Sequence, residues 1–304
     1  MSELSPVRPL EFVVPLPSSV YLLCPSWHGA TLLSLLLGNH SRLFSLGDTI
    51  PANRLFRCRC GKISTDCPFW TEVVRVVAES GDDTIIPARP RLLDNDAFNH
   101  AAIGTVTFLA WWLHMKPWGC ATLAAANERF LQVCRQQKDF DFFIDGYKSI
   151  VRYLALKAER RQPIAGIIHL IRDPRPFAAA GKRRGITVET ACRHWVQQHR
   201  RIDSVVRLFG EKALTLRYED LCTDPEKHLA SILDWLGVSR ELLIHSIDPE
   251  RHWIGSASMR NFDGRLKLSE RWRDELSQRE LDTIIRLAAS EAFRRGYVIS
   301  RPEI

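Results

Sequence analysis

Two groups of residues in this chain have the types and spacing that bind anions. The first is the loop at residues 24–31, CPSWHGAT, which lies between an apolar run and a stretch with helical spacing. A strand, a glycine-bearing turn and a helix N-terminus together aim several backbone N–H groups and the helix dipole at one anion. The loop therefore predicts a site for a phosphate or sulfate ester. A single glycine loop is a weak signal, and a buried turn capped by Thr31 fits the same residues.

The second group follows the apolar run at residues 164–171 and begins with the sequence RDPR at residues 172–175, with a basic run at residues 182–184. The planar guanidinium of arginine is suited to bidentate recognition of phosphate. The alternative is a structural ion pair between Arg172 and Asp173, with the later basic residues in solvent. Two anion-binding strand ends in one sheet predict one ligand with two separated phosphate-type groups.

The elements that must position these loops are predicted from the apolar pattern. Continuous apolar runs are typical of strands in a parallel sheet that is covered on both faces. We expect strands at residues 20–23, 43–46, 141–144, 164–171 and 213–216. We expect helices from residue 31 and at residues 70–80, 101–113, 121–137, 149–160, 188–209, 225–235 and 277–295. This alternation predicts an α/β fold, a three-layer α/β/α arrangement with a mostly parallel central sheet and the ligand at the carboxyl ends of its strands.

The composition is that of a globular protein with an excess of positive charge. Of the 304 residues, 45% are hydrophobic and 25% are charged, and the net charge is +7. These values allow a single domain over residues 1–304, and the charge fits a polyanionic ligand. No apolar stretch reaches the roughly 18 residues of a membrane span, and the first residues lack the pattern of a secretory signal. We therefore expect a cytoplasmic protein without a transmembrane segment, whose eight cysteines are reduced.

Three of the cysteines, Cys58, Cys60 and Cys67, lie close together in the sequence. With one further ligand they would suit zinc, but a C-x-C pair is tighter than the usual C-x₂₋₄-C spacing of structural zinc sites. A loop of reduced thiols beside the substrate, or a single disulfide, fits the same residues. Our expectation is that no metal binds here. The sequence alone does not decide whether these cysteines bind metal or form a disulfide.

Several motifs occur in an order that resembles one enzyme family. They are Trp27-His28-Gly29-Ala30-Thr31-Leu32-Leu33, Leu46-Gly47-Asp48, Cys58-Arg59-Cys60-Gly61-Lys62, Asp66-Cys67-Pro68-Phe69-Trp70, Asp145-Gly146-Tyr147-Lys148, His169-Leu170-Ile171-Arg172-Asp173-Pro174-Arg175, Arg217-Tyr218-Glu219-Asp220-Leu221, Met259-Arg260 and Trp272-Arg273. The chain resembles the sulfotransferases that use 3′-phosphoadenosine 5′-phosphosulfate (PAPS), especially their bacterial small-molecule branch. No single motif is diagnostic, but the ordered set is specific.

The resemblance implies a P-loop-like fold that holds PAPS between the first loop and the Arg172 strand end. By analogy, Arg172 and Arg260 bind the 3′-phosphate, and Tyr218 lies near the adenine. The backbone N–H groups of residues 28–32 hold the 5′-phosphosulfate, and residues 50–140 form a mostly helical insertion on the acceptor side. The cofactor-binding residues implied in this way are Trp27, His28, Gly29, Ala30, Thr31, Leu32, Arg172, Ala180, Tyr218 and Arg260.

This chain departs from the family pattern at both phosphate ends. Trp27 stands where the family has Lys or Arg, His28 stands at a usual Ser, and Ala180 replaces the serine that supports the 3′-phosphate. An indole cannot neutralise the leaving phosphate, so we expect His28, Lys148 or Lys182 to supply the missing hydrogen bond or charge.

For the general base we predict Asp48, which matches the Glu of the family and can take a hydroxyl proton. A loop or N-cap aspartate is the structural alternative. His114 and His252 are lesser candidates for this base.

The predicted function is transfer of a sulfuryl group from PAPS to a hydroxyl or amine of a small-molecule acceptor by metal-free in-line displacement. One alternative is a nucleotide-binding protein of the same fold that has lost catalysis. Another is a P-loop phosphotransferase, against which stands the lack of G-x-x-x-x-G-K-[ST]. We expect no nucleic-acid partner, and the sequence leaves the acceptor and the oligomeric state open, a homodimer included.

Overall fold

The computed structural model of this chain describes residues 15–48, 56–78, 120–248 and 251–299. At its centre is a five-stranded sheet in which all neighbouring strands are parallel. The strands are β1 (Ser18–Leu23), β2 (Leu43–Phe44), β3 (Phe142–Asp145), β4 (Ile164–Ile171) and β5 (Ala213–Arg217), in the spatial order β2-β3-β1-β4-β5. The predicted α/β class with a mostly parallel sheet is confirmed.

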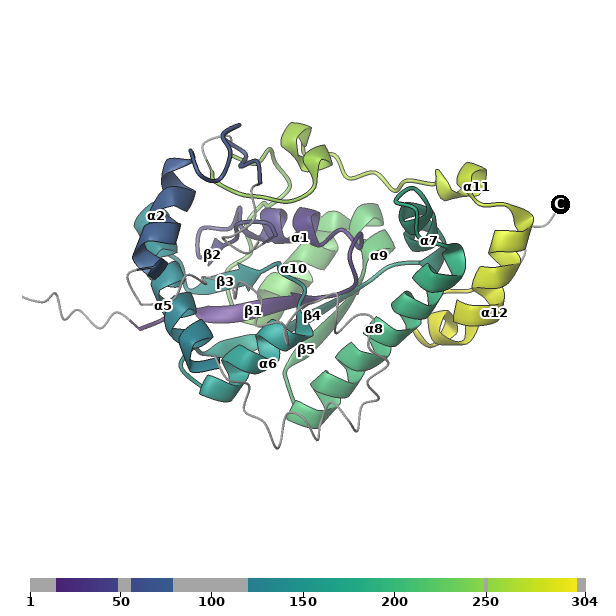
Figure 1. Cartoon of the computed structure of the whole chain (residues 1–304), viewed down its shortest axis with the longest axis horizontal. Coiled ribbons are helices and arrows are strands. Elements are labelled where there is room, and N and C mark those ends of the chain that lie inside the picture. Colours follow the sequence, from purple (N-terminus) through teal and green to yellow (C-terminus); the bar gives the residue numbers. More distant parts are fainter. Residues whose placement is uncertain (1–14, 49–55, 79–119, 249–250, 300–304) are drawn as a thin grey trace, which may run out of the picture.

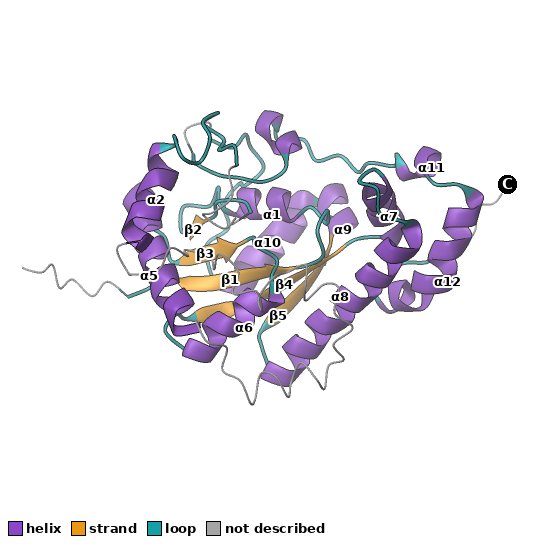
Figure 2. Cartoon of the chain, in the orientation of Figure 1, coloured by secondary structure: helices purple, strands orange, loops and turns teal. Residues whose placement is uncertain are grey.

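Helices cover both faces of this sheet, as Figures 1 and 2 show. One face carries α1 (Ala30–Leu37), α9 (Tyr218–Thr223) and α10 (Pro225–Leu236), and the other carries α5 (Cys120–Gln137), α6 (Ile150–Glu159) and α8 (Val188–Phe209). Successive side chains of a strand point to opposite faces. In β1, Val20 and Leu22 pack on the first set of helices, whereas Tyr21 and Leu23 pack on the second. Both faces of β1 are therefore apolar, which explains its uninterrupted apolar run.

Further helices flank the three layers. Helix α2 (Pro68–Ala78) packs with α5 beyond β2, while α7 (Pro174–Lys182), α11 (Trp272–Glu275) and α12 (Gln278–Arg294) form a separate apolar cluster with α8. A short 3₁₀ helix, η1 (Ala257–Asn261), lies in the loop before α11.

Several element boundaries follow from local chemistry. Helix α10 has Asp224 as its N-cap and Pro225 as its first residue, and it ends at Gly237 in the left-handed conformation. Ser277 and Glu280 form a capping box at the start of α12. The observed bounds of β4 and α8 are the predicted ones.

Two local predictions differ from the structure. The second strand is shorter than residues 43–46, because residues 46–48 leave the sheet and pair with a distant segment, residues 251–260, which we call the strap. The Ile254 N–H donates to the Leu46 carbonyl at 3.0 Å, and the Asp48 N–H donates to the Ile254 carbonyl at 2.9 Å. Thr31 does not cap α1, whose N-cap is Gly29 without a side-chain bond.

The organisation of the insertion is a prediction that the described residues leave open. The whole region 79–119 lies outside them, including the helix predicted at residues 101–113 and His114, a lesser candidate for the base. The single domain over residues 1–304, with an acceptor-side insertion at 50–140, accordingly stays a prediction.

Candidate functional site

The loop after β1 has the backbone shape of an anion cradle. Trp27 has φ +63° and Gly29 has φ +88°, and α1 begins at Ala30. Left-handed residues between right-handed ones turn successive N–H groups toward one point, and the first N–H groups of a helix have no intrahelical acceptor. A Cβ on Gly29 would lie 2.4 Å from ring carbons of Tyr218, so only glycine lets this ring pack on the loop. The loop and Tyr218, both predicted to bind nucleotide, are therefore in direct contact.

Trp27 turns its side chain toward α7. Its ring centre lies 5.5 Å from that of Phe177, and the Arg184 guanidinium stands 4.7 Å over the indole. Arg184 also donates to the carbonyl of Ala180 at 2.8 Å. The indole thus fills space and holds a cation beside the loop through a cation–π contact, rather than carrying a charge itself.

His28 points into the protein and heads a chain of buried histidines. Its Nδ1 lies 3.0 Å from the Ser26 carbonyl oxygen and its Nε2 lies 3.2 Å from Nε2 of His199. Nδ1 of His199 lies 2.8 Å from Nε2 of His169, which faces Asp203 on its other side. Since a carbonyl only accepts, the contact with Ser26 requires the proton of His28 on Nδ1, so that Nε2 of His28 accepts from Nε2 of His199.

The electrostatics of His28 follow from this burial. Loss of water lowers the pKa of His28 to about 3, with the nearby Arg172 charge acting in the same direction. Burial likewise lowers the pKa of His169 and of His199. His28 is thus neutral at pH 7 and brings no positive charge to the loop.

Lys148, Asp48 and Thr31 form a polar cluster at the carboxyl ends of the strands. Lys148 Nζ donates to Asp48 Oδ1 at 2.7 Å, and the Thr31 hydroxyl donates to the same oxygen at 3.0 Å. Lys148 has φ +66°, a strained conformation for a residue with a side chain. A Cβ on Gly146 would lie 2.1 Å from the Gly47 carbonyl oxygen, so the chain segments after β2 and β3 touch here. The structure places a cation, a carboxylate and the α1 hydroxyl within bonding distance.

Arg172 reaches back from the end of β4 to the first loop. Its Nη1 donates to the Trp27 carbonyl at 2.6 Å, and its guanidinium stacks 4.5 Å over the Tyr218 ring. Asp173 pairs with Arg175 at 2.6 Å instead of with Arg172, so the ion pair considered from the sequence does not form. Within the described residues, the buried Nε of Arg172 has no hydrogen-bond partner. The two strand ends that were predicted to bind anions are therefore neighbours.

Three other residues that were predicted to bind the cofactor or to supply a charge have partners outside the contact between Arg172 and Trp27. Arg260 donates to the carbonyls of Arg57 at 2.8 Å and Cys58 at 3.1 Å. Lys182 pairs with Glu280 at 2.8 Å. Ala180 is buried in α7. No contact among the residues that the structure describes joins Arg260 or Lys182 to Arg172.

Two features of the site had no signal in the sequence. The strap crosses the site and pairs with Asp48, although some 200 residues separate the two segments in the chain. The histidine chain gathers His28, His169 and His199 from a loop, a strand and a helix, at spacings with no periodicity.

Comparison with known proteins assigns the family. The profile of the Sulfotransferase family matches residues 74–241, more than half of the chain. The chain belongs to the Sulfotransferase family. A search of curated proteins finds no match for this sulfotransferase-family chain.

Solved structures show the same fold. The sulfotransferase domain from the Synechococcus PCC 7002 olefin synthase is 20% identical, with a TM-score of 0.50, over 91% of this chain and 95% of that chain. The sulfotransferase domain from the curacin biosynthetic pathway is 14% identical, with a TM-score of 0.51, over 94% of this chain and 100% of that chain. None of the helices that the structure describes has the length and apolar character needed to cross a membrane.

Proposed function

We propose that this sulfotransferase-family chain transfers a sulfuryl group from PAPS to a hydroxyl or amine of a small-molecule acceptor. The observation that carries the proposal is the 2.6 Å contact between Arg172 Nη1 and the Trp27 carbonyl oxygen. Because this contact brings the β4 end against the β1 loop, one nucleotide with a phosphate at each end can bridge them. A mononucleotide with one phosphate group would use only half of this arrangement.

The residues present fit such a nucleotide. Arg172 has a buried Nε that lacks a partner among the described residues, and a phosphate oxygen would satisfy it. Tyr218 offers a ring against the cradle, already stacked with the Arg172 guanidinium. The cradle itself supplies backbone N–H groups, whose dipoles favour a sulfate or phosphate oxygen without any metal.

Lys148 is the residue that we propose in place of the cation missing at Trp27. Its ammonium group is 2.7 Å from Asp48, whose other partner is the hydroxyl of Thr31 in the first turn of α1. A fixed positive charge at this position would stabilise the negative charge that develops on the leaving phosphate. His28 does not compete for this role, because its imidazole is buried and neutral.

Asp48 is the residue that we propose as the general base. The Lys148 and Thr31 bonds go to Oδ1, and its backbone N–H is tied to the strap. This support orients the carboxylate, which would take the acceptor's proton as oxygen or nitrogen attacks sulfur in line. Positioning and charge stabilisation then supply most of the rate.

The test is transfer of radiolabelled sulfate from PAPS to a panel of small hydroxylated and amine acceptors. Transfer that requires Lys148 supports the proposal. Tight binding of adenosine 3′,5′-bisphosphate with no transfer to any acceptor would favour the non-catalytic alternative. Binding of ATP with magnesium in place of the bisphosphate would favour a phosphotransferase instead.

A further inference from the structure

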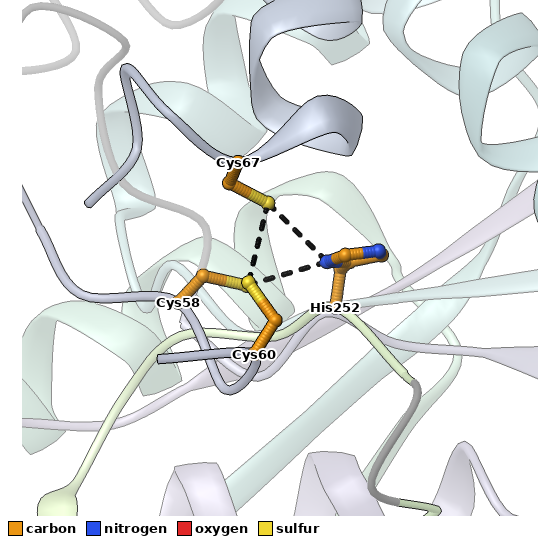
Figure 3. Close-up of side chains that lie close together, drawn as sticks. All are labelled: Cys58, Cys60, Cys67 and His252. Carbon is orange, nitrogen blue, oxygen red and sulfur yellow. Dashed lines mark hydrogen bonds between the residues drawn. The ribbon is translucent and has the colours of Figure 1, made fainter. Parts of the chain in front are cut away.

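The fold gathers three thiols and an imidazole at one point. Cys58, Cys60 and Cys67 come from the turn before α2, and His252 comes from the strap, as Figure 3 shows. One ligand atom from each of the four residues lies within 4.8 Å of the other three. Cys58 and Cys67 are buried, and all three thiols are free rather than bridged.

The distances among these atoms match those around a tetrahedral zinc ion. Bonds of about 2.3 Å to sulfur and about 2.0 Å to nitrogen set sulfurs roughly 3.8 Å apart and sulfur and nitrogen roughly 3.5 Å apart. The Sγ atoms of Cys60 and Cys67 are 3.7 Å apart. His252 Nδ1 is 3.5 Å from Cys58 Sγ and 3.3 Å from Cys67 Sγ. A disulfide would need a sulfur–sulfur distance of about 2.05 Å.

We propose that Cys58, Cys60, Cys67 and His252 bind one zinc ion. Three thiolates and an imidazole are the soft and borderline donors that zinc prefers, whereas calcium and magnesium require oxygen. Four protein ligands fill a tetrahedral shell and leave no position for water or substrate. The proposed site is therefore structural. It differs from our expectation from the C-x-C spacing, which was that no metal binds here.

The backbone around the ligands is built to hold them. The Cys58 N–H donates to the Lys62 carbonyl and the Gly61 N–H to the Cys58 carbonyl, each at 3.0 Å, which closes a tight turn around the first two thiols. Phe69 stacks on the His252 imidazole with ring centres 5.3 Å apart and planes 8° from parallel. This ring fixes the orientation of the imidazole, a role that neighbouring groups take in metal sites.

The ion would join two parts of the chain that are distant in sequence. His252 is 185 residues beyond Cys67. Beside the cluster, the Arg59 N–H donates to the Trp253 carbonyl at 2.9 Å, and Arg260 donates to the Cys58 carbonyl at 3.1 Å. Without a metal, hydrogen bonds hold this junction, namely the backbone bond from Arg59 to Trp253 and the bonds from the charged Arg260 guanidinium. Zinc would add a covalent-strength link between the segment that holds the three cysteines and the strap.

This junction bears on the proposed active site through the strap. Ile254, two residues after His252, accepts the backbone N–H of Asp48 at 2.9 Å. Zinc would thus be a positioning element for the proposed base without touching the reacting atoms. Only this last step rests on the proposed function, since zinc binding itself needs nothing from it.

The experiment measures zinc by mass spectrometry in the full-length protein, purified without chelators. We expect about one zinc per chain in the wild type and in Cys134→Ala, which removes a buried thiol from the same apolar cluster as Cys58 and Cys67. Cys67→Ser and His252→Asn should hold far less than one. Cobalt added to the chelator-treated wild type should give the visible absorption of a tetrahedral thiolate complex, lost in the same two variants.

A second measurement covers the case in which these variants fail to fold. Zinc should protect Cys58, Cys60 and Cys67 of the wild type from alkylation, and a chelator should expose these three thiols together. Metal-free wild type with reduced thiols that takes up neither zinc nor cobalt would overturn the proposal, as would a disulfide among the three. A protein that binds zinc but not nucleotide would instead refute the proposed function and leave the zinc site standing.

Discussion

Lys148 Nζ lies 2.7 Å from Asp48 Oδ1, at a point where two chain segments touch and Lys148 adopts φ +66°. Strained residues of this kind persist where the surrounding structure holds them and are concentrated at functional sites. This conformation places the ammonium group near Thr31 in the first turn of α1. Lys148 follows β3, which is the neighbour of β1, and Trp27 stands in the loop after β1 where the family has a cation.

Lys148→Met should lower the rate of sulfate transfer by roughly 10²–10³-fold, because removal of one charge-stabilising donor has this effect at other oxyanion sites. Single-turnover transfer from PAPS, at saturating nucleotide, measures the change. Lys182→Met is the comparison, since Lys182 is paired with Glu280 and should retain its turnover. Equal loss in both variants, or none in Lys148→Met, would remove Lys148 from the proposed role.

Asp48→Asn should lower the transfer rate by roughly 10²–10⁴-fold, the usual contribution of a general base. The amide keeps the size of the side chain and its bond from Thr31, so the affinity for adenosine 3′,5′-bisphosphate should change little. The transfer rate and the bisphosphate affinity of the same preparation separate the two effects. An unchanged transfer rate in Asp48→Asn would mean that another group accepts the proton.

Gly29→Ala should weaken nucleotide binding, because the new Cβ would lie 2.4 Å from the Tyr218 ring at a φ of +88°. Gly185→Ala is the matched control, since Gly185 has φ +78° with no atom within 4 Å of the added Cβ. Both variants carry the backbone strain of about 1–3 kcal/mol, which urea unfolding measures. Nucleotide affinity should fall only in Gly29→Ala, and a similar fall in the control would assign the effect to strain alone.

The buried histidines should make the protein less stable as the pH falls. Burial holds the pKa of His28 at about 3, below its ordinary value of 6.5, so the unfolded chain binds the proton first. The free energy of unfolding therefore falls as pH drops from 6.5 toward 3, by up to about 1.4 kcal/mol per pH unit for each such histidine.

Urea unfolding of His199→Phe between pH 7 and pH 5 tests this slope. The variant should lose less stability than the wild type over the interval, since a titrating group and its contact with His28 are gone. His245→Gln, at an exposed position, should keep the wild-type slope. Identical slopes in wild type and His199→Phe would show that the histidine chain does not titrate on unfolding.

More of the fold than of the site could be predicted from the sequence, because the signals for helices and strands are local. Apolar runs and caps are local, so β4, α8 and the Asp224 N-cap of α10 follow from a few adjacent residues. The position of Arg172 beside the first loop also follows from parallel strands, whose carboxyl ends share an edge.

Side-chain directions in loops could not be predicted in the same way. His28 turns inward because His199, on another element, offers it a partner. The C-x-C spacing argued against metal, and nothing in the sequence links these thiols to His252, which lies 185 residues beyond Cys67 and meets them only in the fold. Contacts of this kind have no period or spacing, so they emerge only when the fold brings the segments together.

The most direct test of the central claim is a calorimetric titration of the wild type and of Arg172→Lys with adenosine 3′,5′-bisphosphate, beside adenosine 5′-phosphate. The wild type should bind the bisphosphate, and Arg172→Lys should weaken it by about 10- to 100-fold, the value of a charged hydrogen bond, while the affinity for adenosine 5′-phosphate stays the same. No heat of binding in the wild type, or an equal loss for both nucleotides, would contradict a single nucleotide that bridges the β1 loop and Arg172.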